Sequence, residues 1–169
     1  MARFHCNSLG LRIMNAAEFS RFALMRSGIV LEESFLPRKQ EPAVIDSFIR
    51  DITYFASAGY ADSEKIADAL FRLRSLIAEN EFEKLHNILP QGEFPDKNQS
   101  LLSVYDRYLA ALKASKSIDT VGLLRKAMSE AKPLGCQVYT LREYPLTPLE
   151  DELLAQLAPQ RIFSSLTSQ

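Results

Sequence analysis

One short segment of this chain has the residue pattern of a buried β-strand, and it constrains the fold more than any other feature. Residues 136–141 are rich in β-branched and aromatic side chains and carry few charges, whereas the segments before them show helical spacing. A lone strand leaves its own backbone hydrogen-bonding groups unsatisfied, so this strand needs partner strands. Residues 161–163 are a candidate for one of them. We expect the others to lie outside the chain, which we interpret as a piece of a longer protein.

The predicted strand stops abruptly, and a helix opens a few residues later. Thr147, Pro148 and Glu150 combine an N-cap threonine, a proline in the first turn and a glutamate at the third helical position. This combination is a capping box, in which two side chains satisfy free backbone amides at the start of a helix. The sequence therefore predicts a helix over residues 149–157. It also predicts a strand-helix unit over residues 136–169 that belongs to an α/β core.

The residues before this unit are dominated by hydrophobic stripes at steps of three and four. Such stripes predict a mainly α fold, with a helical subdomain of about five or six helices over residues 15–135. Residues 1–14 form an N-terminal segment that we expect to contribute a strand to the α/β core. Residues 90–98 are the clearest loop. The predicted helices cover residues 16–25, 42–58, 63–77 after a cap at Asp62 or Ser63, 82–89, 101–112 and 120–128.

Composition limits the classes of function. Hydrophobic residues at 47% and charged residues at 24% are typical of a globular domain, and the net charge of −1 argues against a protein that coats nucleic acid. Cys6 and Cys136 lack the spacing of a disulfide framework or a zinc site, which favours the reducing cytoplasm. No apolar run approaches the roughly 20 residues that span a bilayer, so we expect no membrane partner.

The residues that most often take part in catalysis do not occur here at the spacings of known catalytic or metal-binding motifs. His5 and His86 have no companion at metal-ligand or catalytic-triad spacing, so we predict no catalytic residue, no metal and no cofactor. Tyr105 and Tyr108 share one helix face with leucines; they either stack on bases or, as we prefer, pack in the core. Asp119 is expected to cap a helix, a role that contributes about 1 kcal/mol.

Two consecutive helical segments have a familiar order. Residues 105–112 place tyrosines and leucines on one helix face, and residues 117–127 follow with a helix led by Asp119. This order resembles the helical subdomain of superfamily 1 helicases of the UvrD and RecB type. In those helicases the Walker B strand comes shortly afterwards, and residues 136–141 stand at that place.

The turn after the strand indicates which group of helicase-like proteins the chain resembles most. Residues 144–150, Tyr-Pro-Leu-Thr-Pro-Leu-Glu, look most like the turn of AddB and related PD-(D/E)XK nuclease proteins, in which it follows a degenerate Walker B strand. A helix that ends at Gly59-Tyr60 also matches the pattern of these proteins. The resemblance covers most of residues 43–158.

The chain departs from an active helicase at the strand tip. The resemblance places Leu141 and Arg142 where a helicase has the Asp-Glu pair that serves Mg²⁺ and the attacking water. Glu143 is adjacent, but neighbouring strand residues point to opposite faces of a sheet. The chain also lacks a G-x-x-x-x-G-K-[ST] loop that would cradle phosphates. The resemblance thus implies an inactivated helicase module.

We therefore expect a non-catalytic helicase-like fragment of a DNA-repair and recombination nuclease protein, with a helicase or nuclease subunit as a further partner. In the resembled helicases the helical subdomain lies near DNA, which implies phosphate contacts from Arg38, Lys39, Arg125 and Lys126. The isolated chain is not expected to be an enzyme, whereas its parent protein would be a nuclease. The alternative is a helical protein-interaction module without a nucleic-acid role, which the near-neutral charge fits equally well.

Overall fold

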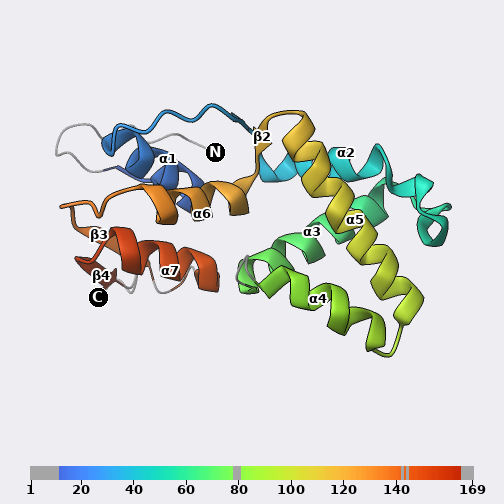
Figure 1. Ribbon diagram of the computed structural model, residues 1–169. Coiled ribbons are helices and arrows are strands. Elements are labelled where there is room, and N and C mark those ends of the chain that lie inside the picture. The colour runs from blue at the N-terminus through green and yellow to red at the C-terminus, as the bar shows by residue number, and fades with distance from the viewer. Residues whose placement is uncertain (1–11, 78–80, 142, 144, 165–169) are drawn as a thin grey trace.

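The computed structural model describes residues 12–77, 81–141, 143 and 145–164, and this part of the chain is mainly helical, as predicted (Figure 1). It contains seven α-helices and two sheets of two parallel strands each. The α-helices are α1 (Ala16–Arg26), α2 (Glu41–Asp46), α3 (Tyr60–Leu76), α4 (Phe82–Ile88), α5 (Pro95–Ala114), α6 (Thr120–Glu130) and α7 (Pro148–Leu157).

Short strands and 3₁₀-helices connect the α-helices. The first sheet pairs β1 with β2, and the second pairs β3 with β4. The strands are β1 (Ser34–Phe35), β2 (Ser117–Ile118), β3 (Val138–Leu141) and β4 (Arg161–Ser164), and the 3₁₀-helices are η1 (Arg38–Gln40), η2 (Ile49–Asp51), η3 (Thr53–Phe55) and η5 (Leu89–Gln91).

The described helices pack around two hydrophobic cores. The α1–α6–α7 core lies at one end of the molecule and the α2–α3–α5 core at the other (Figure 1). The buried members of the α1–α6–α7 core are Phe19, Ala23, Leu24, Val121, Leu123, Leu124, Ala127, Leu149, Leu153, Leu154, Leu157 and Ala158. Those of the α2–α3–α5 core are Ile45, Ile49, Ile52, Ile66, Ala67, Leu70, Val104, Tyr105, Tyr108 and Leu112.

The chain passes from one core to the other and back. It leaves the α1–α6–α7 core after α1, builds the α2–α3–α5 core, and returns through α6 and α7. The two crossings run side by side as β1 and β2, with Ser34 paired to Ser117 and Phe35 to Ile118. Helix α7, from the predicted strand-helix unit, thus shares a core with α1 and α6. The division of the chain at residue 135 stays a prediction.

Several helix ends follow local sequence signals. Helix α1 stops where Gly28 adopts a φ of 77°, and the Ile29 amide donates to the Leu24 carbonyl at 3.0 Å. The capping box of α7 is confirmed: the Glu150 amide donates to Thr147 Oγ1 at 3.3 Å, and the Thr147 amide donates to Glu150 Oε2 at 2.8 Å. The predicted cap of α6 is also confirmed, because the Gly122 amide donates to Asp119 Oδ1 at 2.8 Å.

The predicted long helix over residues 42–58 is wrong. Helix α2 ends at Asp46, and η2 and η3 replace the remainder. Ile49, Ile52 and Phe55 follow one another at steps of three, which matches the three-residue turn of a 3₁₀-helix as well as it matches an α-helix. Ile49 and Ile52 are still buried in the α2–α3–α5 core. The hydrophobic spacing therefore predicted the buried face but not the type of helix.

Two further boundaries differ from the prediction. The loop over residues 90–98 is shorter, because α5 begins at Pro95, a residue suited to the first turn of a helix. Helix α3 is capped at Gly59, and Asp62 occupies the third helical position, where its carboxylate accepts from the Gly59 amide at 3.0 Å.

Two further predictions concern a strand in the N-terminal segment and the absence of a membrane-spanning helix. The predicted strand within residues 1–14 lies largely outside the described residues, and the described residues 12–14 belong to no strand. Among the helices that the structure describes, none has the length and apolar character needed to cross a bilayer.

Candidate functional site

The C-terminal sheet and the helix between its strands form a parallel β3–α7–β4 unit. The strand predicted before α7 is present as β3, and residues 161–163 lie in β4. In register, Val138 pairs with Arg161, Thr140 with Phe163 and Leu141 with Ser164. A strand, a crossover helix and a parallel strand are the building block of α/β cores. This unit holds the predicted strand tip and is the candidate site.

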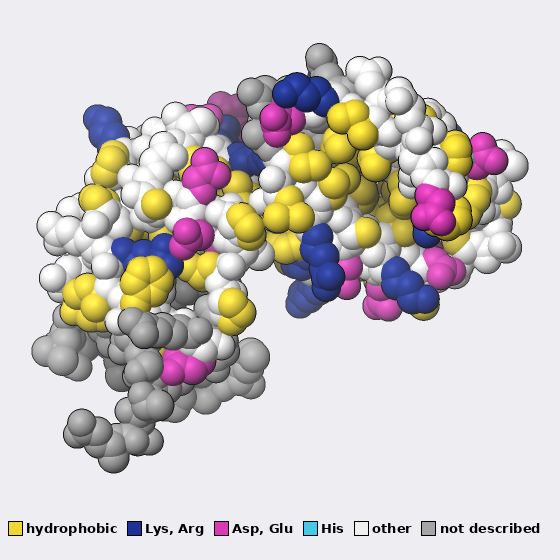
Figure 2. All heavy atoms as spheres, turned by 90° about the horizontal axis from the view of Figure 1, so that it is seen from below, with side chains coloured by type: hydrophobic (Ala, Val, Ile, Leu, Met, Phe, Trp, Pro, Cys, Tyr) yellow, Lys and Arg dark blue, Asp and Glu magenta, His cyan; other side chains and the backbone are white. Residues whose placement is uncertain are grey.

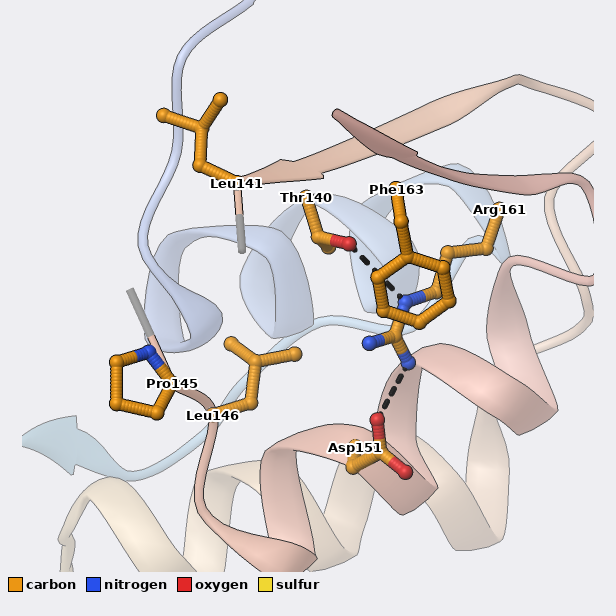
Figure 3. A pocket seen from close by; sticks show the side chains of 7 residues that line it. All are labelled: Thr140, Leu141, Pro145, Leu146, Asp151, Arg161 and Phe163. Atoms are coloured by element: carbon orange, nitrogen blue, oxygen red, sulfur yellow. Dashed lines mark hydrogen bonds and ion pairs between the residues drawn. The ribbon is translucent and has the colours of Figure 1, made fainter. Parts of the chain in front are cut away.

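The two faces of this sheet have different surroundings. Thr140, Arg161 and Phe163 point toward α7, whereas Leu141 points away from it (Figure 3). Tyr139 and Ile162 lie on the same face as Leu141 because neighbouring strand residues alternate. Tyr139 is 57% exposed and Ile162 is 39% exposed. This apolar face is therefore partly exposed among the described residues, while Leu141 at its edge is half-buried.

A hollow of 290 Å³ opens between the sheet and the start of α7 (Figure 3). Arg161 is its main charged group and is held on three sides. Its Nη1 donates to Asp151 Oδ1 at 2.6 Å, its Nε donates to Thr140 Oγ1 at 3.3 Å, and its guanidinium lies 4.2 Å from the Phe163 ring centroid. Arg161 therefore ties β3 and β4 to α7. The lining residues are Thr140, Leu141, Pro145, Leu146, Asp151, Arg161 and Phe163.

Of the three positions predicted to correspond to Walker B acids, one lies in β3. Leu141 is the last residue of β3 and lines the hollow. Arg142 lies outside the described residues, and Glu143 is exposed in the turn that follows. The carboxylate at the hollow is Asp151 of α7, which is paired with Arg161. Within the described part of the chain, no group of three His, Cys, Asp or Glu side chains is arranged to hold a metal ion.

Two of the residues predicted to contact DNA pair with acidic side chains of the chain itself. Arg38 pairs with Glu41 and, at 2.5 Å, with Asp68, and it lies 4.4 Å above the Phe71 ring. Lys126 Nζ lies 3.2 Å from Glu33 Oε1. The Asp68 carboxylate beside Arg38 and the Glu33 carboxylate beside Lys126 lower the positive charge that these side chains offer to a phosphate.

The other two residues predicted to contact DNA, Arg125 and Lys39, differ in whether they bond to the rest of the chain or face solvent. Arg125 Nη2 donates to the Arg74 carbonyl at 2.7 Å and to the Ile77 carbonyl, so it closes the C-terminal end of α3. Lys39 is exposed to solvent beside Arg38. Figure 2 shows Lys and Arg interspersed with Asp, Glu and hydrophobic side chains on the face seen from below. DNA contact by the four residues stays a prediction.

A buried polar cluster lies where the two cores meet, and sequence reasoning missed it. Arg74 of α3 pairs with the Asp119 carboxylate, and the Tyr108 hydroxyl of α5 donates to Asp119 Oδ2 at 3.0 Å. Asp119 is only 2% exposed and also caps α6. Tyr105 and Tyr108 are both buried, so these rings belong to the core and do not form an exposed stacking platform.

Electrostatics within this cluster follow from burial and pairing. Burial opposes the charged form of Arg74, but the adjacent Asp119 carboxylate outweighs it, so the pKa of Arg74 is raised. Burial and the same carboxylate raise the pKa of the Tyr108 hydroxyl, which stays protonated and donates. One signal was present in the sequence: Ile66, Leu70 and Arg74 follow one another at steps of four, which places Arg74 on the buried face of α3.

No protein-family model matches this chain, and neither a curated protein nor a solved structure matches it. Its function is therefore argued from its own residues and their geometry.

Proposed function

We propose that this chain is a non-catalytic, helicase-like piece of a DNA-repair and recombination nuclease protein, in which it acts as a scaffold and contacts DNA. The observation that carries the proposal is the parallel β3–α7–β4 unit, whose strand β3 ends at Leu141. Parallel strands joined by a helix are typical of α/β cores, the class to which helicase motor domains belong.

The partly exposed apolar face of the sheet supports the same proposal. All-parallel sheets occur almost only with both faces covered, and the described structure covers this sheet with α7 on one face. Tyr139 and Ile162 leave an apolar face that further parts of an α/β core would cover. The side chain of Leu141 has no oxygen that could ligate Mg²⁺, which supports a scaffold and not a motor.

The first experiment measures DNA binding by the full 169-residue chain. Fluorescence anisotropy with labelled single-stranded and double-stranded DNA, repeated across salt concentrations, should give affinity that falls steeply with salt, because phosphate contacts release counterions. Lys39→Glu should weaken binding and reduce the salt slope by about 1. Lys97→Glu, the same charge change at the start of α5, is the matched control and should leave binding unchanged.

A second experiment tests the absence of motor activity. The full chain with ATP and Mg²⁺ should release no phosphate above background, with or without DNA. Phosphate release that disappears in Glu143→Gln would contradict the proposal, because it would show a working carboxylate beside the strand tip.

The alternative is a helical protein-interaction module without a nucleic-acid role. Internal partners of Arg38, Arg125 and Lys126 favour it, because these side chains serve the fold. Exposed hydrophobic side chains such as Leu76, Ile88 and Tyr139 also favour it. Absence of salt-dependent DNA binding in the anisotropy experiment would select this alternative.

A further inference from the structure

The carboxyl group of Glu41, at the start of α2, is buried and lies close enough to Asp119 for the two groups to interact electrostatically. The side chain is 5% exposed. Its Oε2 accepts from the Arg38 guanidinium, and its Oε1 is buried without a hydrogen-bond partner among the described residues. A buried carboxylate oxygen that lacks a donor is costly, whereas a protonated carboxyl group carries no charge to compensate.

Charged and titratable groups face Glu41 from each element around it. Arg38 comes from η1, Arg74 from α3, Tyr108 from α5, and Asp119 precedes α6. Two further groups lie one step away: Asp68 of α3 pairs with Arg38, and Tyr105 of α5 interacts with Arg74. Asp119 takes the strong donors: Arg74, the Tyr108 hydroxyl and the Gly122 amide all donate to it. Glu41 keeps only Arg38, which it shares with Asp68. The donors are thus gathered on Asp119, and Glu41 is the carboxyl group of the cluster suited to hold a proton.

We propose that Glu41 is a proton-operated latch that holds α2 against α3 at the junction of the two cores. With a proton on Glu41, α2 is seated on α3. Loss of the proton places a second negative charge near Asp119 in a dry environment and loosens α2. This device goes beyond the proposed function and does not depend on DNA binding.

Glu41 is expected to lose its proton, and so to release the latch, near neutral pH. Burial raises the pKa of Glu41 to about 7; Arg38 partly offsets this rise and Asp119 adds to it. Since the folded pKa lies above the unfolded value of 4.5, the folded state holds the proton more tightly. The stability from this proton is full below pH 4.5 and is lost as pH rises to about 7.

The first test compares equilibrium unfolding of the full chain between pH 4.5 and pH 8.5. Glu41→Gln mimics the protonated carboxyl group, and Glu64→Gln makes the same change on the exposed part of α3. The difference between wild type and Glu41→Gln should change with pH by roughly two orders of magnitude in the unfolding equilibrium constant. Glu64→Gln should follow wild type. A parallel pH profile for Glu41→Gln and wild type would overturn the latch.

Two measurements on the wild-type chain keep the test independent of how well the variant folds. The ¹³C carboxyl resonance of Glu41 should titrate near neutral pH, and a midpoint below 5 would overturn the latch. Hydrogen exchange, corrected for intrinsic rates, should show that amides of α2 lose protection between pH 6 and pH 8 while those of α1 keep it. Equal loss of protection in both helices would indicate a general effect of pH and would also overturn it.

Discussion

The two hydrophobic cores of this chain differ in how polar their buried residues are. The buried residues of the α1–α6–α7 core are apolar except for the neighbouring Ser20, and its sheet leaves one apolar face partly exposed. The α2–α3–α5 core contains two buried tyrosines and ends at a cluster of Glu41, Arg74 and Asp119. Asp119 belongs to both regions, because it caps α6 and pairs with α3. The two cores therefore meet at a buried ion pair, whereas the interior of each core is packed mainly with apolar side chains.

The largest expected effect comes from removing the shared residue. Asp119→Ala should lower the free energy of unfolding by about 4 kcal/mol, because it leaves the Arg74 charge buried and unpaired. Loss of a helix cap alone would cost about 1 kcal/mol. Urea denaturation monitored by circular dichroism distinguishes the two values. The double variant Arg74→Met/Asp119→Leu should recover much of the loss, and no recovery would show that the cap dominates.

A purely apolar change in the other core should have a somewhat smaller effect. Leu153 of α7 is fully buried in the α1–α6–α7 core, and Leu153→Ala should cost about 3 kcal/mol through lost burial and a residual cavity. Thermal and urea unfolding both measure it. Leu76→Ala, at a side chain that is mostly exposed, is the control and should stay within about 0.5 kcal/mol of wild type.

Removing the capping box of α7, next to the candidate site, should lower the free energy of unfolding by a smaller amount. Thr147→Ala should cost about 1 kcal/mol, because the Glu150 amide loses its acceptor. Thr147→Ser keeps a hydroxyl at the same place and should recover most of this stability. An equal loss in both variants would indicate that the threonine methyl group, and not the cap, is responsible.

The smallest expected effect lies on the partly exposed face of the sheet. Tyr139→Ser should change the free energy of unfolding by less than about 0.5 kcal/mol, because the side chain is largely exposed in this chain. A cost above about 2 kcal/mol would mean that Tyr139 is buried in solution, for instance against a second copy. Sedimentation velocity on wild type and variant separates these cases.

Local patterns predicted the elements of the candidate site well. The β-branched and aromatic residues before Leu141 predicted β3, and Thr147 with Glu150 predicted the start of α7. Both depend on residues close together in sequence, so local propensity and capping are sufficient. The same reasoning failed at Ile49 and Ile52, where a spacing of three suits both helix types and packing against α3 and α5 accompanies the 3₁₀ form.

The mainly helical class, the caps of α6 and α7, and a strand that ends at Leu141 follow from local sequence patterns, because each depends on neighbouring residues. Which charges are buried together follows instead from the packing of segments that are distant in sequence. Arg74 and Asp119 are 45 residues apart, and Glu41 joins them from another helix. Periodicity within α3 indicates that Arg74 faces the core, but the partner that compensates its charge depends on how distant segments pack.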